Sequence, residues 1–167
     1  MTGQKWKAGG FTKYYLDLQT SLGWLRVVEE DAAIVRLDIL REQTEAPVDW
    51  KRQDTDLLLE AKRQLEEYFS GIRAGFSLPL APKGTDFQKA VWRQLEAIPY
   101  GETRTYGQIA EALGKPKACR AVGGANHNNP IAIVIPCHRV IGADGSLTGY
   151  AGGIDLKEKL LHLEGVL

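Results

Sequence analysis

The sequence predicts an α+β fold in which a small N-terminal antiparallel sheet with a helix precedes a mostly helical C-terminal domain. β-branched and aromatic residues alternate or cluster from residue 11 to 40, and apolar residues then recur at helical spacing in several later segments. Between these patterns, the stretch FSLPLAPKG at 76–84 holds two prolines and a glycine. We therefore expect one domain over residues 1–82 and a second over residues 83–167, since 167 residues can form two small cores that share an interface.

The first half is expected to contain an antiparallel meander with turns at residues 21–23 and 29–31. Asp54 is expected to open a helix that Gly71 ends, because the apolar residues between them repeat every three or four positions. The start of the stretch FSLPLAPKG is expected to form a short strand before the linker. The apolar face of the helix comprises Leu57, Leu58, Ala61, Leu65, Tyr68 and Phe69.

The second half carries the same helix-start signal twice. Gln88 follows Thr85 by three residues, and Gln108 follows Thr105 at the same distance. This spacing is typical of a capping box, in which the two side chains satisfy backbone N–H groups at a helix start. Gly114 is expected to end the second of these helices.

A further short helix is expected in KACRAVGGANHNN, with Pro116 among its early residues. Two short helices joined by a tight turn predict a helix-turn-helix, which lays its second helix in a DNA groove. The same spacing also fits two helices packed in a core, and the pattern alone leaves both interpretations open. The AVGGA face offers few side chains that could read bases, but it would let the backbone approach a narrow minor groove. Arg120 stands alone beside this face and could insert into the base stack.

Two expectations concern the end of the chain. The apolar stretch IAIVI at 131–135 is expected to be a buried strand or extended segment. Asp155 and Glu158 are expected to cap a leucine-rich closing helix that Gly165 ends.

Composition excludes few classes of function. Lys plus Arg equals Asp plus Glu at 21 each, so the net charge gives no indication of an anionic partner. No stretch approaches the roughly 20 apolar residues of a membrane helix, and the N-terminus lacks the apolar region of a signal peptide. We therefore expect a cytoplasmic protein that is not bound to a membrane, with both of its cysteines free.

Cys137 and His138 stand side by side in AIVIPCHRVIG. No metal site is expected, because His127, His162 and Cys119 lack any usual zinc spacing. A nucleophile is the better functional interpretation, since a thiolate attacks electrophilic carbon well when a neighbouring base lowers its pKa. The alternative is that Cys137 is a small buried hydrophobe and His138 a hydrogen-bonded core histidine.

A third group should orient the imidazole, and Glu164 at the end of the closing helix is the acidic residue that we select. Because neighbours in an extended segment point to opposite faces, His138 is expected to act on Cys137 through a water or a turn. A cysteine hydrolase is disfavoured, because no oxyanion-hole motif is evident.

Several motifs together resemble one family. From about Thr85 to the C-terminus, GETRTYGQIA, RAVGGANHNNP, IPCHRV, GYAGG and KEKLLHLEG occur in the order and spacing of the O6-alkylguanine-DNA alkyltransferases, also called methylated-DNA–protein-cysteine methyltransferases. The region before Pro82 is only broadly similar to that family's variable N-terminal domain. The resemblance implies DNA repair by direct reversal of damage.

The resemblance also implies roles for individual residues. Cys137 would accept the alkyl group from O6 of guanine and keep it as a thioether, so that the protein acts once. His138, a water and Glu164 would form the relay that leaves the sulfur as a thiolate. Asn129 matches a hinge between the DNA-binding helix and the active-site segment.

On the DNA side, Tyr106 matches the tyrosine that protonates guanine N3, and Arg120 matches the finger that fills the gap left by a flipped nucleotide. The carbonyls at Cys137 and Val140 would accept from the exocyclic amine. The implied DNA-binding surface comprises Thr105, Tyr106, Arg120, Ala121, Gly123, Gly124 and Ala125, and the implied alkylguanine pocket comprises Tyr106, Val140, Tyr150 and Ala151.

The expected partner is therefore double-stranded DNA with an alkylated guanine, bound through the minor groove by a monomer without cofactor. O4-alkylthymine as a second substrate and cooperative binding on DNA stay open. Ala151 stands where some relatives have a serine, and no residue before 119 is a Cys or His, so the zinc site of some relatives is not expected. The alternative class is a non-catalytic DNA-binding module; Cys137 together with His138 and Glu164 argues against it, because such relatives replace the cysteine.

Overall fold

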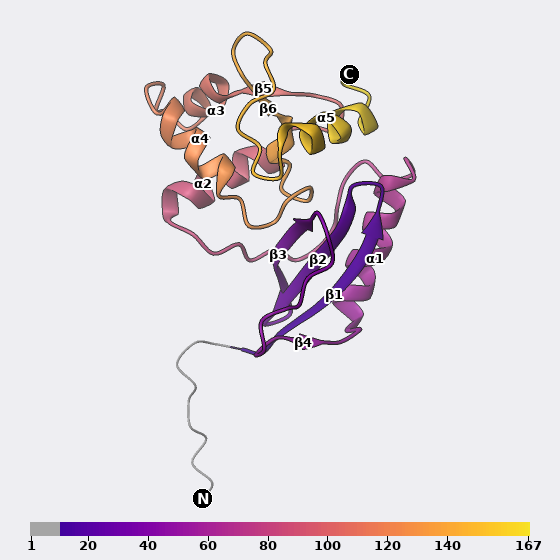
Figure 1. The fold of residues 1–167 in the computed structure, drawn as a ribbon. Coiled ribbons are helices and arrows are strands. Elements are labelled where there is room, and N and C mark those ends of the chain that lie inside the picture. Colours follow the sequence, from indigo (N-terminus) through magenta and orange to yellow (C-terminus); the bar gives the residue numbers. More distant parts are fainter. Residues whose placement is uncertain (1–10) are drawn as a thin grey trace, which may run out of the picture.

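A computed structural model describes residues 11–167, so the first ten residues of the expected N-terminal domain lie outside the described part. The predicted α+β class is confirmed (Figure 1): a sheet with one helix lies below, and the helical half sits above it. The sheet has the order β3-β2-β1-β4. Its strands are β1 (Lys13–Thr20), β2 (Gly23–Glu30), β3 (Ala33–Leu40) and β4 (Lys51–Arg52).

The three long strands form the expected antiparallel meander. The two-residue β4 was not predicted, and it pairs in parallel with β1 through Tyr14 and Lys51. The sheet is therefore mixed rather than purely antiparallel. A pair of residues carries too little periodicity to be recognised as a strand in the sequence.

Helix α1 (Asp56–Phe69) covers one face of the sheet (Figure 1). Its cap is Thr55, whose hydroxyl accepts from the Leu58 N–H, so the expected start at Asp54 was wrong by one residue. Asp54 pairs instead with the Arg52 guanidinium. The helix buries a stripe that includes Tyr68, which is fully inaccessible to solvent. Gly71 follows the last turn at φ +76°, a conformation that suits glycine.

The prediction of a short strand at the start of FSLPLAPKG was also wrong. Only one isolated parallel bridge forms there, between Ile34 and Leu80. The Ile34 N–H donates to the Pro79 carbonyl at 2.8 Å, and the Ala81 N–H donates to Ile34 at 2.9 Å. Pro79 has no N–H of its own, so a longer ladder is not possible at this point.

The C-terminal half is mostly helical, and both predicted capping boxes, at Thr85 and Thr105, are confirmed. Helices α3 and α4 pack against each other and against α2 as the expected helix-turn-helix. The elements are α2 (Asp86–Glu96), β5 (Arg104–Thr105), α3 (Tyr106–Ala112), α4 (Cys119–His127), a 3-10 turn (Cys137–Arg139), β6 (Val140–Ile141) and α5 (Ile154–Leu163).

Two expected helix starts differ from the structure. Pro116 lies in the turn before α4 rather than inside the helix, which begins at Cys119. No side chain caps α5. Asp155, the expected cap, binds Arg41 at the end of β3 instead, and thereby ties the closing helix to the N-terminal half.

The stretch 131–135 is a buried turn and not a strand, apart from one bridge between Leu37 and Ile131. Asn129 causes this difference. Its side-chain oxygen accepts from the Ile131 N–H at 3.0 Å, and its amide donates to the Ile135 carbonyl at 2.7 Å. The curled backbone puts Ile133 at φ +71°, which is unusual for a β-branched residue and is typical of segments constrained for function.

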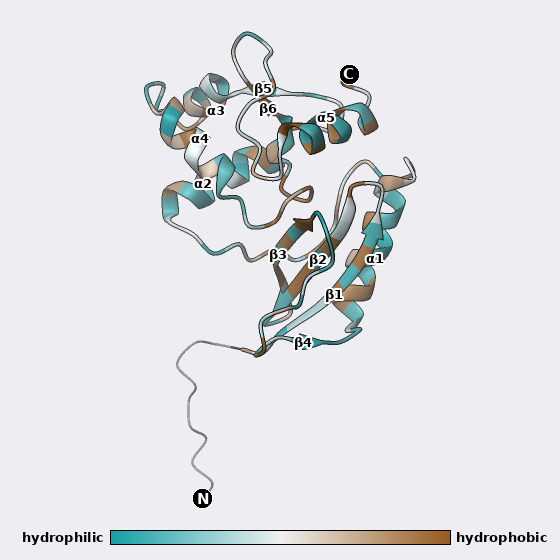
Figure 2. Ribbon diagram, viewed as in Figure 1, coloured by the Kyte–Doolittle hydropathy of each residue, from teal (hydrophilic) through white to brown (hydrophobic). Residues whose placement is uncertain are grey.

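One continuous hydrophobic core extends through both halves. Figure 2 shows hydrophobic residues along β2 and β3, and hydrophilic residues along the outer side of α1. Trp92 of α2 is 2 % exposed and donates its indole N–H to the Ala125 carbonyl of α4, which fixes these two helices together. No helix within residues 11–167 is long and apolar enough to span a membrane.

Candidate active site and DNA-facing helices

Cys137 and His138 occupy the 3-10 turn that follows the curled segment. Neighbouring side chains in such a turn diverge by about 120°, because it has three residues per turn. Cys137 therefore faces a cavity while His138 points toward the end of α5. Both residues are buried, with 6 % and 0 % exposure, and their side chains make no direct hydrogen bond with each other.

The Glu164 carboxylate, at the end of α5, gathers donors from three residues. His138 Nε2 lies 2.7 Å from Oε2. Arg139 donates through Nε to Oε1 at 2.7 Å and through Nη2 to Oε2 at 3.0 Å. Tyr68 of α1 donates its hydroxyl to Oε2 at 2.5 Å. The sequence identified Glu164 and His138 as partners, whereas Tyr68 and Arg139 were missed.

These contacts define the protonation states around the imidazole. Burial alone would raise the pKa of Glu164, but the hydrogen bonds from His138, Arg139 and Tyr68 lower it to about 2. Burial lowers the pKa of His138, and Glu164 opposes that effect. At neutral pH, Glu164 is therefore an anion and His138 a neutral ring whose Nε2 carries the proton, since a carboxylate can only accept. The remaining nitrogen, Nδ1, has no hydrogen-bond partner within residues 11–167.

Burial raises the pKa of the Cys137 thiol, opposed by a hydrogen bond from Asn129 and by the charge of Lys157. The resting sulfur is therefore a thiol, and it must lose a proton before it can attack. Asn129 thus has two roles at the active-site segment: it holds the curled backbone, and it lines the cavity at Cys137 and lowers the pKa of the thiol there.

Lys157 of α5 is a further buried group that the sequence analysis missed. Its ammonium donates to the carbonyls of Val140 at 2.5 Å and Thr148 at 2.8 Å. Burial lowers its pKa to about 8, and the proximity of Cys137 opposes this. A sequence signal for it existed: Lys157 lies three and four positions before Leu160 and Leu161, on the apolar face of the helix, where an unpaired lysine is rare.

Tyr106 starts α3 and also donates its hydroxyl to Thr148, at 3.0 Å. Lys157 and Tyr106 therefore hold the same carbonyl from two sides. Gly149 follows at φ +70°, and a Cβ there would lie 3.0 Å from the Tyr106 oxygen. Glycine at this position leaves the room that the phenol needs.

A cavity of about 160 Å³ opens at Cys137. Tyr150 and Ala151 of the expected alkylguanine pocket line it, together with Leu37 and neighbouring residues of β3. Tyr106 does not line this cavity. Fully buried Val140 does not line it either, and its carbonyl already accepts from Lys157.

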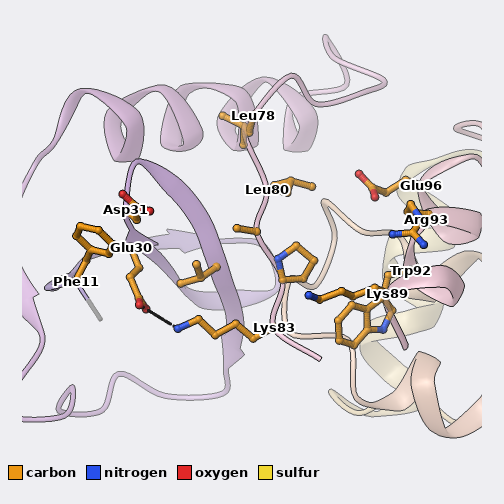
Figure 3. A pocket seen from close by; sticks show the side chains of 13 residues that line it. Phe11, Glu30, Asp31, Leu78, Leu80, Lys83, Lys89, Trp92, Arg93 and Glu96 are labelled. Atoms are coloured by element: carbon orange, nitrogen blue, oxygen red, sulfur yellow. Dashed lines mark hydrogen bonds and ion pairs between the residues drawn. The ribbon is translucent and has the colours of Figure 1, made fainter. Parts of the chain in front are cut away.

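A larger cavity, of about 770 Å³, lies elsewhere, between the sheet, the linker and α2. Figure 3 shows the Lys83 ammonium reaching Glu30 across it, with Trp92 on the far side. Neither cysteine nor histidine lines this cavity. The smaller space at Cys137 is therefore the better candidate for chemistry.

Helix α4 presents the expected smooth face. Arg120, Ala121 and Gly124 are exposed, Gly123 is half-buried, and Arg120 forms no ion pair within residues 11–167. Ala125 does not belong to this surface, because it is 3 % exposed and faces α2. Thr105 is half-buried, and its hydroxyl caps α3.

Fold and site define a class: a protein that combines a helix-turn-helix with a buried cysteine and a His–Glu pair beside it. Two family models match the chain, the "6-O-methylguanine DNA methyltransferase, DNA binding domain" over residues 86–166 and the "ribonuclease-like domain" of the same name over residues 13–82. The chain therefore belongs to the 6-O-methylguanine DNA methyltransferase family, and it is a DNA-repair protein of the alkyltransferase class.

Individual relatives support the same family assignment. The methylated-DNA–protein-cysteine methyltransferase of Methanosarcina barkeri is 54% identical over 153 residues, which cover 90% of this chain and 96% of that protein. The constitutive methylated-DNA–protein-cysteine methyltransferase of Bacillus subtilis is 50% identical over 161 residues, which cover 92% of this chain and 96% of that protein. The crystal structure of the Mycobacterium tuberculosis O6-methylguanine methyltransferase has a TM-score of 0.83 at 46% identity, covering 92% of this chain and 93% of that chain. That protein has also been crystallised in complex with DNA.

Proposed function

We propose that Cys137 takes the alkyl group from O6-alkylguanine in double-stranded DNA in one irreversible turnover, with O4-alkylthymine left open as a second substrate. One observation carries the proposal. The buried thiol adjoins a histidine whose Nε2 is fixed by a carboxylate and whose Nδ1 has no partner within residues 11–167. Such a nitrogen is an acceptor for the thiol proton, directly or through one water.

The reaction balances as a displacement. The thiol proton passes to His138 Nδ1, and the resulting thiolate attacks the alkyl carbon. The S–C bond forms as the C–O6 bond breaks, and its electron pair stays on guanine. Tyr106 releases Thr148 and donates its proton to guanine N3, and solvent later restores the phenol proton and takes that of His138. A thioether is a poor leaving group, so the sulfur is not regenerated.

The DNA-binding part of the proposal concerns α3 and α4. The exposed small residues Ala121 and Gly124 would let α4 lie against a minor groove, where side chains longer than these would clash. Arg120, exposed and without an ion pair in the described chain, would occupy the space of the extruded nucleotide. Flipping is required because the Cys137 sulfur is buried and a stacked base could not reach it.

We also propose a division of labour between residues 1–82 and 83–167. The second part carries the cysteine and the DNA-binding helices, and the first supports it by lining the Cys137 cavity from β3. The protein would act in the cytoplasm as a monomer without a cofactor or metal, because the displacement needs only the thiol, a base and a proton donor.

A mass measurement tests the proposal. The protein is incubated with duplex DNA that contains O6-methylguanine, digested, and examined for one added methylene on the Cys137 peptide. Cys137→Ala should bind the DNA but gain no mass. Cys119→Ala is the matched control, because Cys119 is also free but exposed, and it should react like the wild type.

The alternative of a non-catalytic binding module gives a different result. Such a protein would bind the methylated duplex reversibly and would stay unmodified by the free base O6-benzylguanine. An unmodified wild-type Cys137 after both incubations contradicts the proposal.

A further inference from the structure

The two carboxylate oxygens of Glu164 accept different numbers of hydrogen bonds. Oε1 accepts from Arg139 Nε alone, whereas Oε2 accepts from His138, Arg139 Nη2 and Tyr68. Two of these residues belong to the 3-10 turn, but Tyr68 comes from α1, 96 positions earlier in the chain. The N-terminal half therefore reaches the group that orients the histidine.

Donors that share one acceptor oxygen also share its charge. The Tyr68 hydroxyl withdraws electron density from the oxygen that His138 Nε2 uses, so the bond to the imidazole is weaker than Glu164 alone would make it. The effect is not screened, because Tyr68 is fully buried and the Glu164 side chain has no exposure. Burial raises the pKa of Tyr68 far above its usual value, so the phenol stays a donor throughout.

We propose that Tyr68 is a positioning residue for alkyl transfer, through which the N-terminal half limits the proton affinity of His138. This inference rests on the proposed function, because it concerns the base of that reaction. Tyr68 does not line the cavity at Cys137, and it would act through the carboxylate oxygen to which it donates.

Other charged and titratable groups surround this network. Arg139 also donates through Nη1 to the Ile98 carbonyl, and its guanidinium lies over the Tyr100 ring at 5.8 Å. Tyr100 donates to the Leu163 carbonyl at 3.1 Å and therefore does not touch the carboxylate. Arg139 and Lys157 each lower the pKa of His138 by their charge. Removing the Tyr68 hydroxyl leaves all of these contacts in place.

The sign of the effect follows from proton counting. The reactive pair, thiolate with imidazolium, holds as many protons as the resting pair, thiol with imidazole. A histidine of higher proton affinity shifts this balance toward the reactive pair at neutral pH. In acid, the inactive form is thiol with imidazolium, so His138 is protonated in both the inactive and the reactive form. The proton affinity of His138 therefore does not affect the rate at low pH.

The test compares Tyr68→Phe with Tyr100→Phe, which removes a hydroxyl from the same aromatic cluster. The rate of reaction with O6-benzylguanine is measured from pH 5 to 9. For Tyr68→Phe we expect the plateau near neutral pH to rise about threefold, as expected for a modest gain in proton affinity. At low pH, the rate of Tyr68→Phe should equal that of the wild type. Because its plateau is higher, the pH at which the rate reaches half of the plateau moves upward. Tyr100→Phe should follow the wild-type profile.

A second readout uses the same variants: the His138 Nε2–H proton resonance should move downfield in Tyr68→Phe and stay in place in Tyr100→Phe. A third measurement keeps the test decisive if Tyr68→Phe folds poorly. The analogue 3-fluorotyrosine at position 68 is a stronger donor of almost the same size, and should lower the plateau. An unchanged or lower plateau in Tyr68→Phe, or an unchanged or higher one with the analogue, would overturn the inference.

The outcome is separable from that of the proposed function. If wild-type Cys137 gains no alkyl group, the proposed function fails, whatever the histidine resonance does. If Cys137 is alkylated but the Tyr68 and Tyr100 variants behave alike, only the role of Tyr68 is wrong.

Discussion

The two sides of the 3-10 turn differ in how their polar atoms are paired. On the Glu164 side, the carboxylate, the His138 Nε2 and the Arg139 guanidinium are all hydrogen bonded. On the Cys137 side, three buried polar atoms have no partner within residues 11–167. These atoms are Asn126 Oδ1, His138 Nδ1 and Tyr150 Oη.

All three unpaired atoms belong to residues that adjoin Cys137 in the sequence or in space. Asn126 donates its amide to the Cys137 carbonyl at 3.3 Å, Tyr150 lines the same cavity as Cys137, and His138 is the next residue. Unpaired buried polar groups are costly, and where they persist they commonly mark a site of function. We call the Glu164 side, where the polar atoms are paired, the saturated side and the Cys137 side the unsaturated side, and we propose that the unsaturated side receives the substrate and a proton.

The largest expected effect is on the saturated side. Glu164→Gln removes the negative charge that compensates the buried Arg139 guanidinium, whose side chain is 8 % exposed. Leaving a buried charge without its partner costs about 3–5 kcal/mol, so urea denaturation should show a loss of that order. Glu102→Gln, at an exposed pair with Arg104, is the control and should cost below about 1 kcal/mol.

The same variant changes the acid sensitivity. The pKa of Glu164 in the folded protein is about 2, below its ordinary value of 4.5, so its stabilising contribution is complete above pH 4.5. That contribution declines as the pH falls from about 4.5 toward 2. The free energy of unfolding of Glu164→Gln should therefore fall less steeply over this range. Equal slopes would contradict a charged, paired Glu164.

A second prediction compares two tyrosines with opposite surroundings. Tyr68→Phe removes a buried hydrogen bond to a charged group and should lower the free energy of unfolding by about 1.5–3 kcal/mol. Tyr150 is 8 % exposed, and its buried hydroxyl has no partner in residues 11–167. Tyr150→Phe should therefore be neutral or slightly stabilising. Equal losses in the two variants would show that the Tyr150 hydroxyl is paired after all.

The saturated side could be only half predicted from the sequence. The PCHR motif and the closing helix indicated Cys137, His138 and Glu164, because residue type and position in a helix are local properties. Helical spacing also placed Tyr68 on a buried face. Helical spacing could not indicate that the Tyr68 hydroxyl donates to Glu164, because that contact joins the two halves of the chain and depends on how the halves pack.

Local sequence patterns predicted the structure of the unsaturated side less well. IAIVI has the composition of a strand, yet it is a turn, because the side chain of Asn129 takes the place of a neighbouring strand as the hydrogen-bond partner. The meander and the two capping boxes followed their local signals, since each is completed by residues close in sequence. Tertiary contacts override such signals at the site, as is typical of functional segments.

The smallest effect is expected at Lys157, whose charge lowers the pKa of the Cys137 thiol. Lys157→Met keeps most of the buried volume but removes the cation that opposes the burial of the Cys137 thiolate. The pKa of Cys137 should therefore rise, and its alkylation by iodoacetamide at neutral pH should slow by a factor on the order of three to ten. Lys159→Met, exposed on the same helix, is the matched control. If both variants react at the wild-type rate, the charge of Lys157 does not reach the sulfur, and its two carbonyl contacts are its whole contribution.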